Sequence, residues 1–163
     1  MQIRSAKTAD LDAIKAIEDI SFPPNQRVSK EAFGEFLAKF ADDIFVACEN
    51  NQIIGEIVSL CTNERDFDDD MFFGTKFHDK DGAWLMGLSL GVVPEFRGRE
   101  IGSALIGTLQ THALARAKSG IVLTCEECLV KFYEKFGFVN EGICKSKFGD
   151  KSWYQMRWEI KKG

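Results

Sequence analysis

Hydrophobic residues recur along this chain at two different spacings, which predicts a domain containing both helices and strands. Apolar residues lie three or four positions apart, the spacing of one helical face, in three long segments: 10–20, 29–40 and 100–118. A shorter segment of this kind, 126–136, predicts a fourth helix that ends at Gly137. Thr8 and Ser29 are suitable N-caps for the first two helices, because a hydroxyl can accept a free backbone N–H.

Seven segments are largely apolar or alternate between apolar and polar residues, and they therefore predict strands. They are residues 2–4, 44–48, 53–62, 83–93, 121–124, 138–144 and 152–160. Glu49-Asn50-Asn51 predicts a hairpin turn between the second and third strands. The order of these elements predicts an α/β (α+β) fold, in which a mixed, mostly antiparallel central sheet of about seven strands is flanked by about four helices.

Residues 63–82 have no regular period and form a long excursion between two predicted strands. Long excursions inside compact domains are often functional. Within them, residues 64–70 hold five acidic side chains and one basic one, whereas the remaining acids and bases balance. This acidic run is either a solvated loop or a surface that attracts cationic amines.

Composition and charge narrow the functional classes. The chain has 163 residues, 45% hydrophobic and 28% charged, which is typical of one globular domain over 1–163. The net charge of −4 argues against nucleic-acid binding, and no apolar run approaches the roughly 20 residues of a membrane span. No apolar leader is visible and the five cysteines lack framework spacing, which favours a cytoplasmic protein with reduced thiols. With two histidines, we expect no metal site.

The most informative segment runs from Leu88 to Leu105. An apolar strand ends at Pro94, a turn carrying Arg97 and Arg99 follows, and a helix then begins. The first N–H groups of a helix lack partners and lie at the positive end of its dipole, so this arrangement favours an anion. The alternative is a basic loop that only caps the helix.

This segment resembles the acetyl-CoA signature of the GNAT acetyltransferase superfamily, whose core pattern Arg/Gln-x-x-Gly-x-Gly/Ala falls on residues 97–102. Residues 123–138, LTCEECLVKFYEKFGF, resemble the C-terminal motif of the arylalkylamine N-acetyltransferase branch. Residues 21–24 and 142–156 are similar to the same branch, and all the matches follow in the expected order. The resemblance implies a GNAT-type fold with a splayed V between the central strands, in which acetyl-CoA lies.

The resemblance also implies which residues contact acetyl-CoA, the co-substrate. Free backbone groups of Leu90, Gly91 and Val92, at a bulge in the strand, would bind pantetheine and face the thioester carbonyl. Independently of the resemblance, Gly91 suits a bulge or a close backbone approach, because glycine has no side chain. The turn that follows would cradle the pyrophosphate through Arg97, Gly98, Arg99, Glu100, Ile101, Gly102 and Ser103.

The resemblance further implies that a free amine attacks the thioester directly and that Tyr133 protonates the leaving thiolate. A phenol of pKa about 10 beside a thiolate of pKa about 8.5 suits that step. Tyr133 lies off the helical face shared by Leu129, Phe132 and Phe136, which favours an acid role. The alternative is a packing aromatic.

Three features depart from the family pattern. Glu100 replaces the central glycine; in the first turn of a helix its carboxylate would favour the helix but repel phosphate, and glycine would weaken the helix. Met86 and Leu88 stand where vertebrate members carry a histidine pair, and Gln26 stands where a glutamate is common. The general base is therefore unassigned. Three acids near the expected substrate loops are either candidates or solvated helix charges: Glu18, Asp19 and Glu31.

Other residues have two interpretations each. His78 is a surface loop histidine or a site residue. Cys125 and Cys128 form a C-x-x-C pair, for which a redox role has no supporting flanks. Five phenylalanines line an apolar amine pocket or belong to the core: Phe22, Phe33, Phe36, Phe72 and Phe73.

The main hypothesis is a metal-independent N-acetyltransferase that uses acetyl-CoA to acetylate a small primary alkylamine, aromatic ones included. Its expected partner is this amine, with no nucleic acid or membrane, in a monomer or homodimer. The acidic residues 64–70 favour cationic small amines. Two alternatives stay open: a protein or peptide N-acetyltransferase, and a CoA-binding regulatory module with weak or no turnover, which Glu100 and Gln26 favour.

Overall fold

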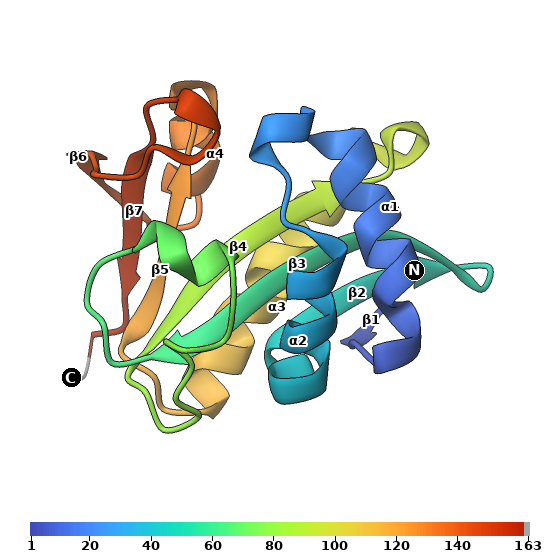
Figure 1. Cartoon of the computed structure of the whole chain (residues 1–163), viewed down its shortest axis with the longest axis horizontal. Coiled ribbons are helices and arrows are strands. Elements are labelled where there is room, and N and C mark those ends of the chain that lie inside the picture. The colour runs from blue at the N-terminus through green and yellow to red at the C-terminus, as the bar shows by residue number, and fades with distance from the viewer. Residues whose placement is uncertain (162–163) are drawn as a thin grey trace.

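The computed structural model describes residues 1–161 and contains one seven-stranded sheet with helices on both faces (Figure 1). The strands lie in the order β1-β2-β3-β4-β5-β7-β6, and neighbours are antiparallel except for the parallel pair β4 and β5. Their bounds are β1 Gln2–Ser5, β2 Ile44–Glu49, β3 Gln52–Thr62, β4 Trp84–Val92, β5 Gly120–Cys125, β6 Val139–Ile143 and β7 Tyr154–Glu159. The predicted fold class is confirmed.

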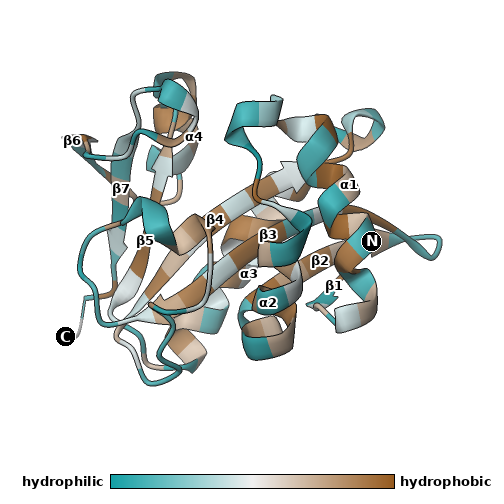
Figure 2. Cartoon of the chain, in the orientation of Figure 1, coloured by the Kyte–Doolittle hydropathy of each residue, from teal (hydrophilic) through white to brown (hydrophobic). Residues whose placement is uncertain are grey.

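Helices α1 and α2 cover one face of the sheet, and α3 and α4 pack on the other (Figure 1). Their bounds are α1 Leu11–Ser21, α2 Lys30–Phe40, α3 Ile101–Ala115 and α4 Val130–Glu134. Each layer has its own apolar core: Phe33 and Phe36 of α2 are buried against one face, and Leu105 and Leu109 of α3 against the other. Figure 2 shows hydrophobic positions along the central strands and hydrophilic ones on the outer turns.

Helix ends follow the sequence in part. Ser29 caps α2 as predicted, because its hydroxyl accepts the Ala32 N–H at 3.0 Å. Thr8 does not cap α1; it begins a short 3₁₀ turn, in which Asp10 accepts the Lys7 N–H at 2.8 Å. The predicted helix 126–136 is shorter than expected, because its first turn is 3₁₀ and only α4 is α-helical.

Residues 1–161 contain neither a membrane-spanning helix nor a cluster of metal-binding side chains. No helix in residues 1–161 combines the length and apolar composition needed to cross a bilayer. Nowhere in this range do three or more histidine, cysteine or acidic side chains converge in a way that would hold a metal ion. The five cysteines are free thiols.

Candidate active site

The parallel strands β4 and β5 pair for only part of their length and then diverge (Figure 1). Ladder pairs join 84–87 of β4 to 120–123 of β5, and pairing ends there although β4 continues to Val92. The edge of β4 beyond Gly87 therefore faces a gap instead of a ladder partner. This is the V that the resemblance implied.

A β-bulge in β4 lies at the start of this divergence. The register with β3 passes from Ser89 to Gly87 and skips Leu88. A bulge bends the strand and increases its twist, which helps to turn β4 away from β5. The bulge was expected at 90–92 and lies earlier. Gly91 instead allows a close approach of α1, because an added Cβ would lie 2.7 Å from Ile17 Cγ2.

An inner cavity of about 100 Å³ occupies the gap. Its polar lining includes Glu18, Gln26, Ser89 and Thr124, whereas most of its wall is apolar. The apolar side chains come from seven parts of the chain: Phe22, Val28, Ile57, Phe72, Leu88, Leu90, Ile106, Leu123, Leu129, Phe148 and Trp153. The phenylalanine prediction is thus divided. Phe22 and Phe72 line the cavity, Phe33 and Phe36 belong to the core, and Phe73 is exposed.

Two loops contact each other above the inner cavity, and we call them the roof loops: residues 22–29 and residues 144–153. Asn25 Nδ2 donates to the Gly149 carbonyl at 3.2 Å, and the ring of Phe148 stacks on Phe72 at 4.2 Å. Asp69 holds the second loop by accepting the Ser146 hydroxyl and the Lys147 N–H. These contacts close the cavity on this side.

An outer cavity of about 550 Å³ lies next to the inner one. Half of the ten residues expected to contact acetyl-CoA line it: Leu90, Gly91, Val92, Arg97 and Gly102. Tyr133 and Leu90 line both cavities, so the two spaces meet at these residues. Other polar lining residues are Ser21, Gln26, Glu126 and Lys151.

The turn before α3 has an unusual backbone. Gly98 has φ +79° and Glu100 has φ +61°, and Glu100 is the N-cap residue of α3. The expectation that Glu100 lies in the first helical turn is therefore wrong. Left-handed backbone favours glycine because it has no Cβ, which explains the glycine of the family pattern. The Glu100 side chain is exposed and makes no capping hydrogen bond within residues 1–161.

The remaining predicted cofactor residues differ in their surroundings. Arg99 makes a bidentate ion pair with Glu49, at 2.8 and 3.1 Å, instead of standing free above the turn. The Ile101 side chain is buried in the core, so only its backbone N–H could meet an anion. Ser103 is half-buried in the first turn of α3. Arg97 remains the cationic side chain on the outer cavity, with its Nε donating to the Val92 carbonyl at 3.1 Å.

Tyr133 projects from α4 into the space between the two cavities. Its ring is buried, with edge contacts to Phe132 and Phe138. Burial raises the pKa of the Tyr133 hydroxyl well above its usual range, so this group stays protonated at neutral pH. Cys125 lines the inner cavity, and burial raises the pKa of its thiol to about 12, so this thiol stays protonated at neutral pH.

A buried acidic cluster borders the inner cavity. Glu18 is 1% exposed, and its Oε1 accepts the Ser89 hydroxyl at 2.7 Å. The same hydroxyl lies 2.9 Å from Oε1 of Glu56, which is 0% exposed. Glu18 is among the bases predicted from the sequence, whereas Ser89 and Glu56 are not. The only available signal was an acid among the apolar residues of 53–62.

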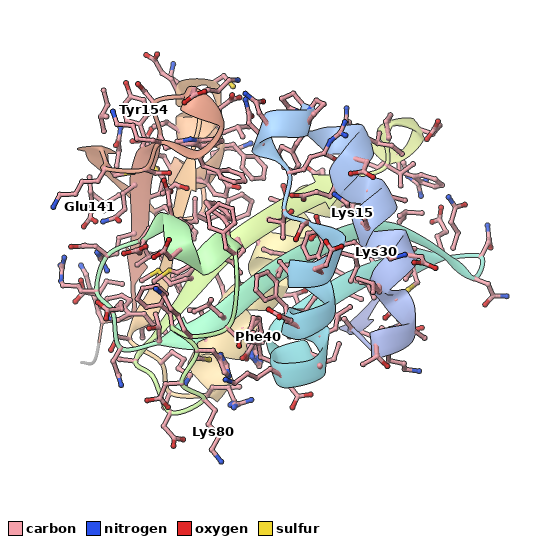
Figure 3. The ribbon with its side chains drawn as sticks, viewed as in Figure 1. Lys15, Lys30, Phe40, Lys80, Glu141 and Tyr154 are labelled. Carbon is pink, nitrogen blue, oxygen red and sulfur yellow. The ribbon has the colours of Figure 1, made fainter. Side chains whose placement is uncertain are left out.

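The other candidate bases lie outside the site. Asp19 pairs with Lys15 at 2.8 Å on the surface, and Glu31 is exposed on α2. Figure 3 labels Lys15 on α1. His78 stacks on Phe40 at 4.6 Å, and burial lowers the pKa of its imidazole.

The acidic residues 64–70 have structural partners in the main. Asp66 pairs with the buried Arg157 at 2.9 Å, Asp70 pairs with Lys76 at 3.1 Å, and Asp68 accepts the Asp70 N–H. Asp69 holds the second roof loop. The acids therefore shape and fasten the loop more than they present free charge. Glu141 in the adjoining β6, labelled in Figure 3, also pairs with Arg157.

Comparison with known families decides the assignment. Residues 41–140 match the model of the acetyltransferase (GNAT) domain. The chain belongs to this family.

Several known proteins are similar to this GNAT domain. N-alpha-acetyltransferase 60 of Xenopus tropicalis is 35% identical over 101 residues, which is 56% of this chain and 41% of that protein. The chain thus matches less than half the length of this relative. Among solved structures, the loading GNATL domain of CurA from Lyngbya majuscula has a TM-score of 0.83 at 16% identity, covering 97% and 96% of the two chains. Ard1 from Thermoplasma volcanium has a TM-score of 0.76 at 16% identity, covering 99% and 98%.

Proposed function

We propose that this GNAT domain transfers the acetyl group of acetyl-CoA to the primary amine of a small apolar alkylamine. The observation that carries the proposal is the inner cavity, which is small, mostly apolar and closed on one side by the roof loops. Its volume is of the order of the ~150 Å³ cavities that hold a benzene ring. The similarity of residues 123–138 to the arylalkylamine branch supports the same acceptor class.

The outer cavity suits the pantetheine arm and diphosphate of acetyl-CoA. The edge of β4 beyond Gly87 offers backbone groups without a ladder partner, as an extended amide chain needs. At its other end the cavity reaches Gly102 in the first turn of α3, whose unpaired N–H groups favour phosphate. Arg97 adds a positive charge there. The residues present therefore fit this co-substrate.

Tyr133 supplies the acid for the reaction. The amine nitrogen in the inner cavity forms a bond to the thioester carbonyl carbon, and the carbon–sulfur bond breaks. The Tyr133 hydroxyl lies where the two cavities meet and gives its proton to the departing sulfur. The free edge of β4 near Leu90 offers N–H groups to the oxygen that gains negative charge.

A second candidate function is acetylation of a protein N-terminus. The 35% identical relative, an N-alpha-acetyltransferase, favours it. Against it stand the contacts between Asn25 and Gly149 and between Phe72 and Phe148, because a peptide continuing beyond its first residues needs an open groove.

The experiment is a turnover assay that measures the release of CoA thiol with a series of primary amines of increasing apolar size. We expect turnover with phenylethylamine-sized amines, and a rise in kcat/KM from methylamine to that size as the cavity fills. Acetyl-CoA binding by calorimetry without turnover of any amine or peptide would contradict the proposal and favour a regulatory module.

A further inference from the structure

Two carboxyl groups, one of them at the wall of the inner cavity, share one hydroxyl. Ser89 Oγ lies 2.7 Å from Glu18 Oε1 and 2.9 Å from Glu56 Oε1. Glu18 and Ser89 line the inner cavity, whereas Glu56 lies behind them on β3. The second oxygen of Glu56, Oε2, is buried and has no hydrogen-bond partner among residues 1–161.

The distances require an additional proton in this cluster. A serine hydroxyl carries one hydrogen and can donate it to one of its two neighbours only. If both carboxyls were ionised, the other pair of oxygens would lie within 3 Å of each other with no hydrogen between them. One of the two carboxyl groups is therefore protonated and donates to Ser89 Oγ.

The surroundings identify which carboxyl holds the proton. Glu18 Oε2 accepts the Val28 N–H at 2.7 Å, and this hydrogen bond favours the charged form. Glu56 has no such donor, and burial together with the charge of Glu18 raises the pKa of Glu56 well above its usual range. Glu56 is thus the neutral acid and donates a hydrogen bond to Ser89 Oγ. The Ser89 hydroxyl in turn donates a hydrogen bond to Glu18.

We propose that Glu18 is the catalytic base that takes a proton from the bound ammonium of the acceptor, and that Ser89 and protonated Glu56 are positioning residues that hold the Glu18 carboxylate at the cavity wall. This inference rests on the proposed function. In this proposal Glu18 takes the role that a histidine pair has in vertebrate members of the arylalkylamine branch. Met86 and Leu88 stand at the positions of that pair.

The protons balance as follows. The acceptor ammonium loses one proton to Glu18 and becomes the free amine that attacks the thioester. Tyr133 gives its proton to the thiolate as the carbon–sulfur bond breaks. The nitrogen loses its second proton once the carbon–nitrogen bond has formed, and this proton returns to the Tyr133 oxygen, which restores the phenol. Glu18 then releases its proton to solvent, so each turnover liberates one proton.

Charged and titratable groups face Glu18 from four elements. On α1, Lys15 favours the carboxylate and Asp19 opposes it. Glu56 approaches from β3, and Cys125 and Tyr133 lie across the cavity on β5 and α4. Burial keeps Cys125 and Tyr133 protonated at neutral pH. Burial also raises the pKa of Glu18 toward neutral pH, which makes its carboxylate a stronger base.

The first test is Glu18→Gln, with Glu31→Gln on exposed α2 as the matched control. We expect Glu18→Gln to lower kcat at neutral pH by about 100-fold or more, with acetyl-CoA affinity unchanged. Its rate should recover in proportion to free amine as the pH approaches the amine pKa of about 10. A structural role would not give this recovery. Wild-type kcat and an unchanged pH profile in Glu18→Gln would overturn the base assignment.

The second test reads the proton on Glu56 without turnover. An unfolded glutamate ionises above about pH 4.3, so holding Glu56 neutral in the fold costs stability that grows with pH above that value. Glu56→Gln should therefore raise Tm relative to wild type at pH 7, and the gain should shrink to nothing at pH 4. An equal difference at both pH values would overturn the proton assignment. Absence of wild-type turnover would overturn the proposed function and the base role, but leave this measurement intact.

Discussion

At the scale of single residues, the backbone at Glu100 explains why the family pattern has glycine at this position. The N-cap position of α3 has φ +61°, a conformation that costs an L-residue on the order of 1 kcal/mol and glycine nothing. The family pattern has glycine at this position for that reason as well as for space. Glu100 keeps the backbone shape and adds an exposed carboxylate at the N-cap of α3.

We predict that Glu100→Gly is more stable than Glu100→Ala by about 1 kcal/mol, or about 2–4 °C in Tm for a chain of this size. At a position inside the helix the order would be reversed, since alanine is there the better residue. Thermal unfolding of the two variants without ligand measures the difference. A more stable alanine variant would show that residue 100 is helical in solution.

Glu100→Gly should also bind CoA severalfold more tightly than wild type, because it removes a repulsion of about 1 kcal/mol between the Glu100 carboxylate and the diphosphate. Glu100→Gln separates charge from backbone, since it removes the carboxylate and keeps the side chain. Calorimetry that finds equal affinity in wild type and both variants would show that the carboxylate points away from the diphosphate.

Tyr133 carries a further prediction at this scale. Tyr133→Phe keeps the ring in its packing against Phe132 and Phe138 and removes only the proton donor. We expect kcat to fall by about 100-fold or more, with acetyl-CoA affinity nearly unchanged. Equal kcat values for the two proteins across the pH range would remove Tyr133 from the mechanism.

At the scale of elements, the periodic segments could be predicted and the contacts between distant segments could not. The strands and the main helices appear in the predicted order because each has a buried face that repeats along the chain. The β4 bulge lies at Leu88 and not at the expected residues 90–92. Its position depends on the register with the partner strand β3, which the pattern within β4 does not contain. Likewise, the burial of Glu18 depends on Ser89 and Glu56, which are far away in sequence.

The roof loops give a prediction at this scale. Asp69→Ala removes the acceptor for the Ser146 hydroxyl and the Lys147 N–H, so the second roof loop should loosen and KM for small amines should rise severalfold. Asp70→Ala is the matched control, since it deletes an equal charge whose partner among residues 1–161 is the exposed Lys76. We expect the Asp69→Ala effect at low and high salt alike. An equal, salt-sensitive rise in both variants would instead support electrostatic attraction of the amine.

At the scale of the whole molecule, the fold brings two cavities together at one point. The divergence of β4 and β5 opens the space, the turn before α3 borders its outer part, and the roof loops close its inner part. Tyr133 and Leu90 lie where the two parts meet. Such a shape suits a reaction that joins a long, anionic donor to a small, apolar acceptor.

The most direct test of this account compares two acceptors at saturating acetyl-CoA: phenylethylamine and a short peptide with a free N-terminal methionine. The small inner cavity, closed on one side by the roof loops, predicts a kcat/KM at least about tenfold higher for the amine, a difference of about 1.4 kcal/mol in transition-state free energy. A kcat/KM that is higher for the peptide would contradict the account. The roof loops would then have to open in solution, and the protein would act on N-termini.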